Sequence, residues 1–469
     1  MLPTLAMATA GAQTAEPGES PYGPLADAPD ENGLLLPEGF TSRVIATSGE
    51  KVLGTTLTWH AYPDGAACFP LADEDDDGWI YVCNSEVFSF VVPDAGGVSA
   101  IRFDADGDVV DAYPILRGSN SNCAGGPTPW GTWLSGEESA DEKGRIWECD
   151  PTGEKEAVAH PAMGLFAHEA AAVDPEGKAV YLTQDNPAGL LYRYTPANYP
   201  DLRTGLLEAA LVAEDGAVTW QAVPDPSAAT TPTRDQVPGA AVFPGGEGIW
   251  YHDGFVYFTT KYDHSVHSID LADQRHRVIW KGDPDGKGIE GAVLSGVDNI
   301  TVDDGSGDLF VAEDGGNMEL VMITPDGVVA PFARITGEGQ DGSEVTGPCF
   351  NPAGDRLYFS SQRGPTPKPV SEIIPGAGIT EKLGGITYEV TGPFRGAKIK
   401  ADAEAGSTTV PSPVSTLGQA GGTDEKSGSG DDDANAPLLI GGGVAVVAAA
   451  AGGLIAVRRR RNAEGDPTL

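Results

Sequence analysis

The sequence predicts an all-β fold, a six-bladed β-propeller. Its 63 glycines and 37 prolines in 469 residues indicate many turns and disfavour long helices. Six strand–turn–strand units recur through the middle of the chain, roughly fifty residues apart except for one larger gap, and such a period is typical of propeller blades. A β-sandwich or two smaller β-domains would not explain this even spacing.

The second strand of each unit is short and apolar and follows a hairpin-type turn rich in acidic residues and glycine. We expect these strands at residues 79–82, 131–134, 179–182, 255–258, 308–311 and 356–359. The larger gap lies between the third and fourth units, where the Pro- and Thr-rich segment 195–238 is predicted to be a surface loop. Residues 41–46 and 385–390 flank the six units as short apolar strands. One could complete a blade begun by the other, which would close the ring.

The charge and the N-terminal segment indicate an exported protein. The net charge of −40 argues strongly against a nucleic-acid-binding surface, which needs a basic patch. It suits a secreted or salt-tolerant protein and a site rich in cations. Residues 1–15 are apolar and rich in alanine, with Ala-x-Ala patterns that resemble the end of a secretory signal peptide, although no basic segment precedes them. We therefore predict a signal peptide, shortened at its start, in residues 1–15.

The C-terminal segment predicts a membrane anchor. Residues 438–457 form a continuous run of apolar and small residues as long as a bilayer-spanning helix. Arg458 to Arg461 follow at once, so the positive-inside rule places the tail 458–469 in the cytoplasm. Residues 403–436 are rich in Ser, Thr, Gly and Asp and predict a disordered stalk. We expect a monomeric, single-pass protein of the cell membrane with an extracellular propeller in residues 35–395.

Polar residues recur at the strand ends that should meet at the propeller channel. The first strand of each unit should be the innermost, and these strands begin near Asp64, Cys123, His168-Glu169, Glu247, Asp298-Asn299 and Cys349. The following strands end near Asn84 and Glu86, Glu137 and Glu138, Asp185, Glu313 and Asp314, and Gln362. Converging carboxylates repel one another unless cations neutralise them, so this recurrence predicts a metal site. Oxygen donors suit Ca²⁺, and a thiolate adds affinity for iron.

The same residues carry a family resemblance. The motif Asn-Cys-Ala-Gly-Gly-x-Thr-Pro-Trp-Gly-Thr at 122–132, followed by Glu137-Glu138, resembles the signature of the PhoX-type alkaline phosphatases. The similarity continues through residues 84–86, 166–170, 246–248, 298–303, 312–314 and 350–354. It implies an iron and calcium cluster (Fe³⁺ and Ca²⁺) at the end of the channel of a six-bladed propeller. It also implies hydrolysis of phosphate monoesters of small molecules outside the cytoplasm.

The resemblance implies roles for individual residues. Cys123 would be the thiolate on iron, and Glu169 and Glu247 would be carboxylates shared among the metals; these three would be the catalytic residues. The further metal ligands would be Glu86, Glu313, Asp314, Asn84 and Asp298. Gly245 and Gly246 stand near the position where an arginine of the family could hold phosphate, and Arg363 or Lys261 could supply that charge.

Two other functions remain open from the sequence, because propellers with metals in the channel host several chemistries. One is a calcium-dependent lactonase-like hydrolase, and the other is a calcium-stabilised, non-catalytic surface propeller that binds a partner or a glycan. Cys123 discriminates among them, since a calcium-only site does not need a thiolate. The histidines at 60, 160, 252, 264 and 267 do not cluster, and His168 stands out only because it adjoins Glu169 and could orient it.

Overall fold

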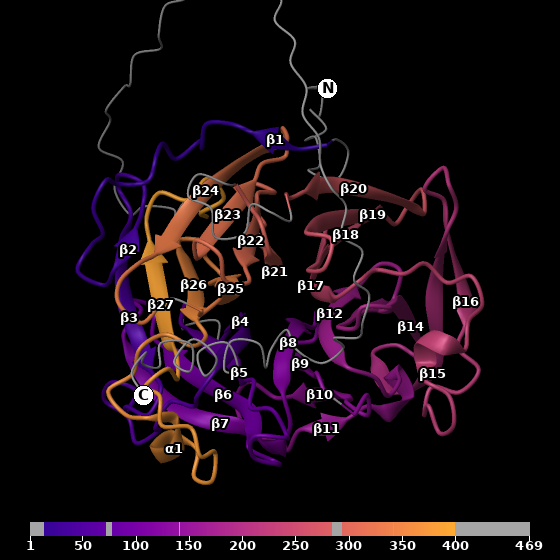
Figure 1. Cartoon of the computed structure of the whole chain (residues 1–469), viewed down its shortest axis with the longest axis horizontal. Coiled ribbons are helices and arrows are strands. Elements are labelled where there is room, and N and C mark those ends of the chain that lie inside the picture. The colour runs from indigo at the N-terminus through magenta and orange to yellow at the C-terminus, as the bar shows by residue number, and fades with distance from the viewer. Residues whose placement is uncertain (1–13, 72–76, 140, 284–292, 341, 399–469) are drawn as a thin grey trace, which may run out of the picture. The chain divides into compact units, whose positions relative to one another are not determined.

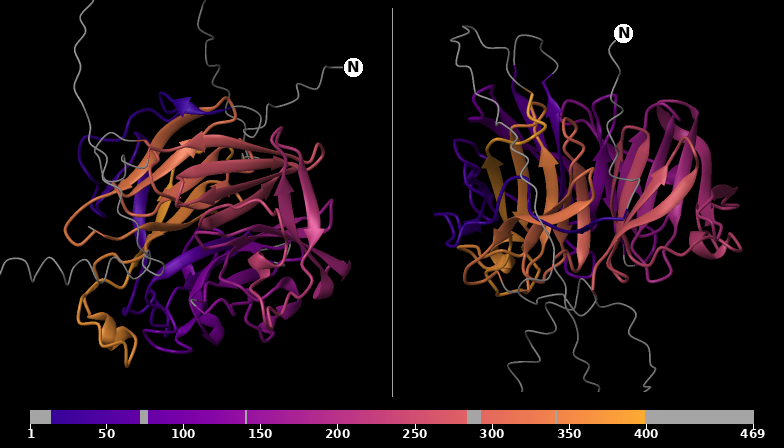
Figure 2. Two further views of the ribbon diagram at one scale, coloured as in Figure 1. Left: turned by 45° about the vertical axis from the view of Figure 1, so that its right-hand side comes forward. Right: turned by 90° about the horizontal axis from the view of Figure 1, so that it is seen from above.

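The computed structural model describes residues 14–71, 77–139, 141–283, 293–340 and 342–398. Six antiparallel sheets surround a central axis, and each sheet begins with its innermost strand (Figure 1). The right-hand view in Figure 2 shows the strands running from one face of the propeller to the other. The predicted all-β, six-bladed fold is confirmed.

The blades follow one another in chain order. The first three are β4 (Pro63–Pro70), β5 (Trp79–Ser85), β6 (Gly96–Phe103) and β7 (Val109–Ser119); β8 (Asn122–Pro127), β9 (Trp133–Glu137), β10 (Ile146–Cys149) and β11 (Val158–Ala159); and β12 (His168–Asp174), β13 (Ala179–Gln184), β14 (Leu191–Asn198), β15 (Asp201–Val212) and β16 (Val218–Ala222). The next two are β17 (Gly246–His252), β18 (Phe255–Thr260), β19 (Ser265–Asp270) and β20 (Arg275–Lys281); and β21 (Val297–Val302), β22 (Leu309–Glu313), β23 (Glu319–Ile323) and β24 (Val328–Ile335). The short strands β1 (Glu16–Pro17) and β2 (Leu34–Leu35) pair with β24 at the outer edge of the fifth blade.

The sixth blade closes the ring with strands from both ends of the domain. It consists of β25 (Val345–Phe350), β26 (Arg356–Ser361), β27 (Ile386–Thr391) and β3 (Thr41–Thr47). β27 and β3 are antiparallel, with Ile386 opposite Thr47 and Thr391 opposite Thr41. The hypothesis that segments 41–46 and 385–390 complete one blade is therefore confirmed. The short helix α1 (Val370–Ile373) lies in the connection between β26 and β27.

The prediction of a surface loop over residues 195–238 is wrong as far as residue 222. β15 and β16 occupy Asp201–Val212 and Val218–Ala222 and extend the third blade to five strands. Leu207, Ala209 and Ala210 of β15 are buried, so an apolar stretch within this Pro- and Thr-rich region supplies blade core. The larger gap in the repeat is thus filled by an additional strand as well as by a loop.

The middle strands are largely apolar because both of their faces pack against neighbouring blades. Every residue of β5 and of β13 is buried. Aromatic side chains bridge the first and sixth blades, where the rings of Tyr81 and Tyr358 lie 5.0 Å apart and Trp79 Nε1 donates to Tyr358 Oη at 3.1 Å. These contacts pack the blade that is built from both chain ends onto its neighbour.

The innermost strands converge closely just beyond their first residues. In all six, the pairing with the second strand shifts register near the start, between Pro63 and Ala66 in β4 and at the corresponding places in the others. Small residues follow, and a Cβ added to Gly65 would lie 2.4 Å from Ala124 Cα, while one added to Gly248 would lie 2.5 Å from Ile300 N. Only glycine permits this approach at these two positions. The bulges turn the side chain before the contact toward the axis.

Some predicted segments lie outside the described residues. The predicted signal peptide falls there except for its last two residues, and the predicted stalk, membrane helix and cytoplasmic tail fall there entirely. Within the described ranges, no helix is long and apolar enough to cross a membrane.

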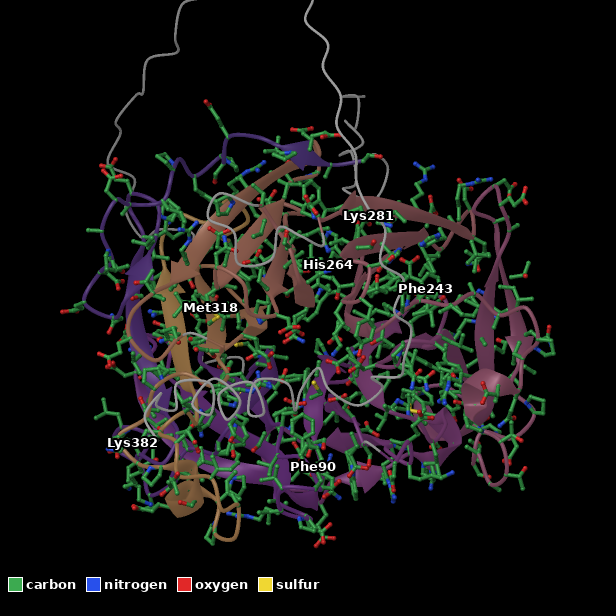
Figure 3. The ribbon with its side chains drawn as sticks, in the orientation of Figure 1. Phe90, Phe243, His264, Lys281, Met318 and Lys382 are labelled. Carbon is green, nitrogen blue, oxygen red and sulfur yellow. The ribbon has the colours of Figure 1, made fainter. Side chains whose placement is uncertain are left out.

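Two histidines share a buried hydrogen bond in the fourth blade. His267 Nδ1 and His276 Nε2 lie 3.0 Å apart, and the ring of Phe243, labelled in Figure 3, packs against both. Burial lowers the pKa of His276 to about 4 and, together with His276, holds the pKa of His267 well below its usual range. Both rings are therefore neutral in the folded protein near neutral pH.

This pair predicts an acid-sensitive stability. Below about pH 6.5 the unfolded chain protonates His276 whereas the folded chain does not until about pH 4, so the free energy of unfolding falls as the pH falls through this window. The difference in the free energy of unfolding between His276→Gln and the wild type, measured by urea denaturation, should therefore change with pH. It should shift by about 1.4 kcal/mol in favour of the variant when the pH is lowered from about 7.5 to about 5.5. An unchanged difference between the two proteins would show that His276 titrates normally when folded.

Candidate metal centre

Five side chains form a ring at the axis, and we call them the first ring. They are the second residues of five innermost strands: Asp64, Cys123, Glu169, Glu247 and Asp298. All five are buried. Each stands at the register shift of its strand, where the bulge re-aims the side chain. The sixth blade has Thr346 at this position, and its hydroxyl donates to the carbonyl of Pro63 at 2.8 Å.

A second set of side chains lies beside the first ring, and we call it the exit set. It consists of the residue that directly follows the second strand of each blade: Glu86, Glu138, Asp185, Lys261, Asp314 and Gln362. Gln362 Nε2 donates to Asp64 Oδ2 and, at 2.8 Å, to Glu86 Oε2. Lys261 Nζ lies 2.6 Å from Glu247 Oε1 and 2.7 Å from Asp185 Oδ2. These contacts join the two sets.

The two sets contain three groups of side chains that could each hold a metal ion. Within a group, one donor atom of each side chain lies within 4.8 Å of the others. The groups are Asp64, Glu86 and Cys123; Cys123, Glu138 and Glu169; and Glu169, Glu247 and Asp298. Consecutive groups share one member, Cys123 between the first two and Glu169 between the last two. Figure 3 shows side-chain oxygen atoms gathered around the centre of the propeller.

Burial makes the charged forms of these side chains unfavourable without a cation. It raises the pKa of Asp64, Glu169 and Glu247, and the neighbouring carboxylates raise the pKa of Asp64 and Glu169 further. Burial likewise raises the pKa of the Cys123 thiol, with Asp64 as the next cause. Burial also raises the pKa of Glu86, although the charge of Arg363 opposes this shift. A bound cation would reverse this balance.

Several donor atoms of the first ring have no hydrogen-bond partner. Both carboxylate oxygens of Glu169 and Oδ1 of Asp64 are buried without a partner among the described residues. An unsatisfied buried carboxylate oxygen is strongly unfavourable, and native proteins pair nearly all such atoms. Oxygen donors in this number suit a hard cation such as Ca²⁺, and a thiolate suits a softer metal such as iron. The residues therefore fit a mixed cation centre.

The structure brings together five of the residues predicted as ligands or catalytic groups. Cys123, Glu169, Glu247, Glu86 and Asp298 all belong to the three groups. Asp314 belongs to the exit set and raises the pKa of Glu247 and of Lys261 electrostatically, but it lies outside those groups.

Asn84 is a predicted metal ligand, and that role stays a prediction. In the structure both ends of its amide are engaged by the protein. Its Nδ2 donates to the carbonyls of Cys123 and Ala124 at 3.0 and 2.9 Å. Its Oδ1 accepts from Trp133 Nε1 at 2.9 Å and from Ser135 Oγ at 3.0 Å. Asn84 therefore fixes the backbone of β8 beside the Cys123 thiol.

Glu313 lies outside the three groups, and its predicted ligand role likewise stays a prediction. Its two carboxylate oxygens accept from the backbone amides of Ser295 and Glu319 at 3.0 and 3.1 Å. Burial, followed by the charge of Glu319, raises the pKa of Glu313 to about 8. Because successive residues of a strand point to opposite faces, Asp314 faces the first ring and Glu313 the neighbouring loops.

Two residues of the metal groups were absent from the predicted ligand set. The sequence places Asp64 at the start of a strand and Glu138 at the end of one, but the predicted ligand set contains neither. The missing signal is the position within the blade, because every carboxylate of the centre is the second residue of an innermost strand or the first residue after a second strand. Cys349, which the sequence places with the innermost strand starts, is buried in the core cluster of the first and sixth blades.

His168 does not orient Glu169. Its Nε2 lies 2.9 Å from the carbonyl of Gly164, and its ring stacks on Phe166 with centroids 3.6 Å apart. Burial lowers the pKa of His168 to about 3, so the ring is neutral. His264, labelled in Figure 3, accepts from the amide of Gly296 at 2.9 Å and joins the fourth and fifth blades. Neither histidine belongs to the three groups.

Both cations predicted to hold phosphate lie at this end of the channel. Lys261 belongs to the exit set, and Arg363 follows Gln362 directly. Arg363 Nη1 lies 2.9 Å from Glu344 Oε2. Burial lowers the pKa of the guanidinium, but the charges of Glu344 and Glu86 outweigh burial and hold this pKa above its usual range. These cations offset part of the negative charge around the centre.

The sequence matches a known family over most of the propeller. Residues 93–287 and 278–364 match the family described as alkaline phosphatase PhoX. No curated protein sequence matches the chain.

A solved phosphatase structure shares the fold. The chain is similar to PhoX of Pseudomonas fluorescens in complex with vanadate, a transition state analogue, with a TM-score of 0.63 and 18% identity, over 80% of this chain and 99% of that one. It is less similar to a protein of unknown function from Bacteroides thetaiotaomicron, with a TM-score of 0.45 and 12% identity over 75% of this chain and 76% of that one. A gluconolactonase of Xanthomonas campestris gives a TM-score of 0.38 and 14% identity over 81% of this chain and 99% of that one.

The metal groups predict opposite effects of one substitution with and without calcium. When a chelator has removed the metal, Glu169→Gln should raise the free energy of unfolding. The variant lacks the buried Glu169 carboxyl, whose oxygens have no hydrogen-bond partner among the described residues. In calcium a hundredfold above its dissociation constant, the wild type should gain about 3 kcal/mol per site, and the variant should lose most of that gain. Chemical denaturation in each condition measures both effects.

Glu313→Gln is the matched control for this prediction, because Glu313 is also a buried glutamate but contacts backbone amides. It should keep the calcium-dependent gain of the wild type. If Glu313→Gln loses the gain and Glu169→Gln keeps it, the cation site lies at the fifth blade and not on the first ring.

Proposed function

This chain belongs to the PhoX family of alkaline phosphatases, and on that premise we propose that it hydrolyses phosphate monoesters at a cation centre built from the first ring and the exit set. The observation that carries the proposal is the set of buried donor atoms without partners, above all both oxygens of Glu169. A structural ion pair would satisfy these atoms within the protein. Here they are left for a ligand.

We propose Ca²⁺ and Fe³⁺ as the cations. Cys123 would hold the iron through its thiolate, and the oxygen ligands would come from the three groups: Asp64, Glu86, Glu138, Glu169, Glu247 and Asp298. When bound, such cations stabilise the charge that develops on phosphoryl oxygens in the transition state. The shared positions of Cys123 and Glu169 would hold neighbouring cations at a fixed separation.

The protein's own side chains would orient the centre and attract the substrate. Gln362 holds the carboxyls of Asp64 and Glu86 together through its amide nitrogen. Asn84 fixes the carbonyls on either side of the Cys123–Ala124 peptide, which limits movement of the thiol. Lys261 and Arg363 place positive charge beside the centre, where a phosphate dianion would otherwise be repelled by the carboxylates.

The location of the protein is proposed from the sequence. The apolar run at 438–457 with its following arginines supports a single membrane anchor, and the net charge of −40 supports an exported domain. On this basis we place the propeller outside the cell membrane, where it would act as a monomer on phosphorylated small molecules.

The proposal predicts hydrolysis of p-nitrophenyl phosphate by the chain loaded with calcium and iron. Glu169→Gln and Cys123→Ala should each lower kcat/KM at least about a hundredfold, because each removes a ligand shared between two groups. Glu148→Gln is the control and should retain activity. The Glu148 carboxylate accepts hydrogen bonds from Trp130 and Thr132 and belongs to none of the metal groups.

Three outcomes separate the candidate functions. Phosphatase activity that both site variants lose supports the proposal. Hydrolysis of a lactone but not of the phosphoester by the loaded chain would favour the lactonase-like alternative. Binding of calcium without hydrolysis of either substrate would favour a non-catalytic propeller.

A further inference from the structure

Lys261 is the one cationic member of the exit set. The corresponding residue is a carboxylate in four other blades, Glu86, Glu138, Asp185 and Asp314, and Gln362 in the sixth. The side chain of Lys261 is 15% exposed. Its ammonium therefore lies where the other blades present oxygen donors.

The ammonium of Lys261 joins two carboxylates from neighbouring blades. Its Nζ lies 2.7 Å from Oδ2 of Asp185, in the third blade, and 2.6 Å from Oε1 of Glu247, in its own blade. Glu247 also belongs to the metal group with Glu169 and Asp298. The ammonium is thus adjacent to that group, on the side of Asp185.

The backbone makes room for the stem of this lysine. Gly245 has φ +66°, and a Cβ there would lie 2.8 Å from Lys261 Cγ and 2.5 Å from the ring of Tyr262. The amide of Lys261 donates to the carbonyl of Gly245 at 2.8 Å. The glycine and this hydrogen bond hold the lysine in one place, so its contact with the two carboxylates is a built feature of the fold.

We propose that the ammonium of Lys261 takes the place of a divalent cation between Asp185 and Glu247. The centre then binds one metal ion fewer than its carboxylates could accommodate. The covalently attached ammonium neutralises the carboxylates of Asp185 in the third blade and Glu247 in the fourth. This inference rests on the metal centre of the proposed function but not on its reaction. A fixed ammonium differs from a metal ion because a chelator cannot remove it.

Removal of this charge should create a new metal site. In Lys261→Met, the carboxylates of Asp185 and Glu247 would remain buried without their counter-ion, and together they would offer oxygen ligands to calcium. Lys261→Arg would keep a cation at the same place. The number of bound ions is therefore the property by which this role of the lysine is measured.

The test is the calcium content of the full chain after loading with calcium and iron and removal of free metal, measured by elemental analysis and native mass spectrometry. Lys261→Met should bind one calcium ion more per chain than the wild type, and Lys261→Arg should bind the same number as the wild type. Arg193→Met, which breaks an ion pair with Glu208 in the third blade, is the control and should leave the calcium content unchanged. An equal or lower calcium content in folded Lys261→Met would overturn the proposal.

A second variant tests the same proposal without removing the lysine. Asp185→Asn should retain the full calcium content, because Asp185 faces the ammonium and not a metal ion. Loss of one calcium ion in Asp185→Asn would overturn the proposal even if Lys261→Met does not fold. If the calcium contents change as expected while p-nitrophenyl phosphate is not hydrolysed, the proposed function fails and this inference stands; the reverse pattern would leave the function and remove the inference.

Discussion

Mutual repulsion among buried carboxylates at the axis is the constraint on which the rest of the structure depends. The first ring places four carboxyls and one thiol at the axis, and the exit set adds four carboxyls beside them. Within each of the three metal groups the donor atoms lie within 4.8 Å of one another. Protons can relieve this repulsion in part, as the raised pKa values of Glu169 and Glu138 indicate. Cations relieve it more completely, since they also satisfy oxygens that lack a hydrogen-bond partner.

The propeller supplies the geometry that this repulsion would otherwise prevent. Six strands can approach one axis only because small residues such as Gly65 and Gly248 stand where the backbones meet. The bulge before each of these contacts then directs one polar side chain inward. The ring is held closed by the pairing of β27 with β3, so the core packing of all six blades opposes the electrostatic tendency of the centre to open.

The blades contribute unequally, and this asymmetry gives the centre its chemistry. The second blade provides the thiol of Cys123, and the fourth provides the cation Lys261. The sixth blade has Thr346 at the position where each of the other five has a carboxylate or thiol of the first ring. The three metal groups consequently follow one another from the first blade to the fifth. Lys261 stands at the side of the last group. A phosphate dianion would meet a centre whose negative charge is already partly neutralised by the protein.

The repeat spacing predicted the fold, because the strand-turn-strand period depends on local patterns that the sequence displays. The residue class at the strand ends also predicted the place of the centre. The sequence does not show which of two neighbouring acidic residues at a strand end faces the axis. Glu313 and Asp314 differ by one position, and the end of β22 decides which of them faces the axis. Asn84 looked like an oxygen donor, but its role depends on Trp133 and Ser135, which only the packing of two blades brings to it.

The most direct test of the account is a crystal structure of the chain loaded with calcium and iron, with anomalous diffraction recorded at the iron absorption edge. The account predicts an iron peak bonded to Cys123 Sγ, at about 2.3 Å as for metal–thiolate bonds, with further cations on the shared carboxylate of Glu169. Anomalous peaks confined to exposed acidic turns, with Glu169 and Cys123 free of metal in the loaded crystal, would contradict it.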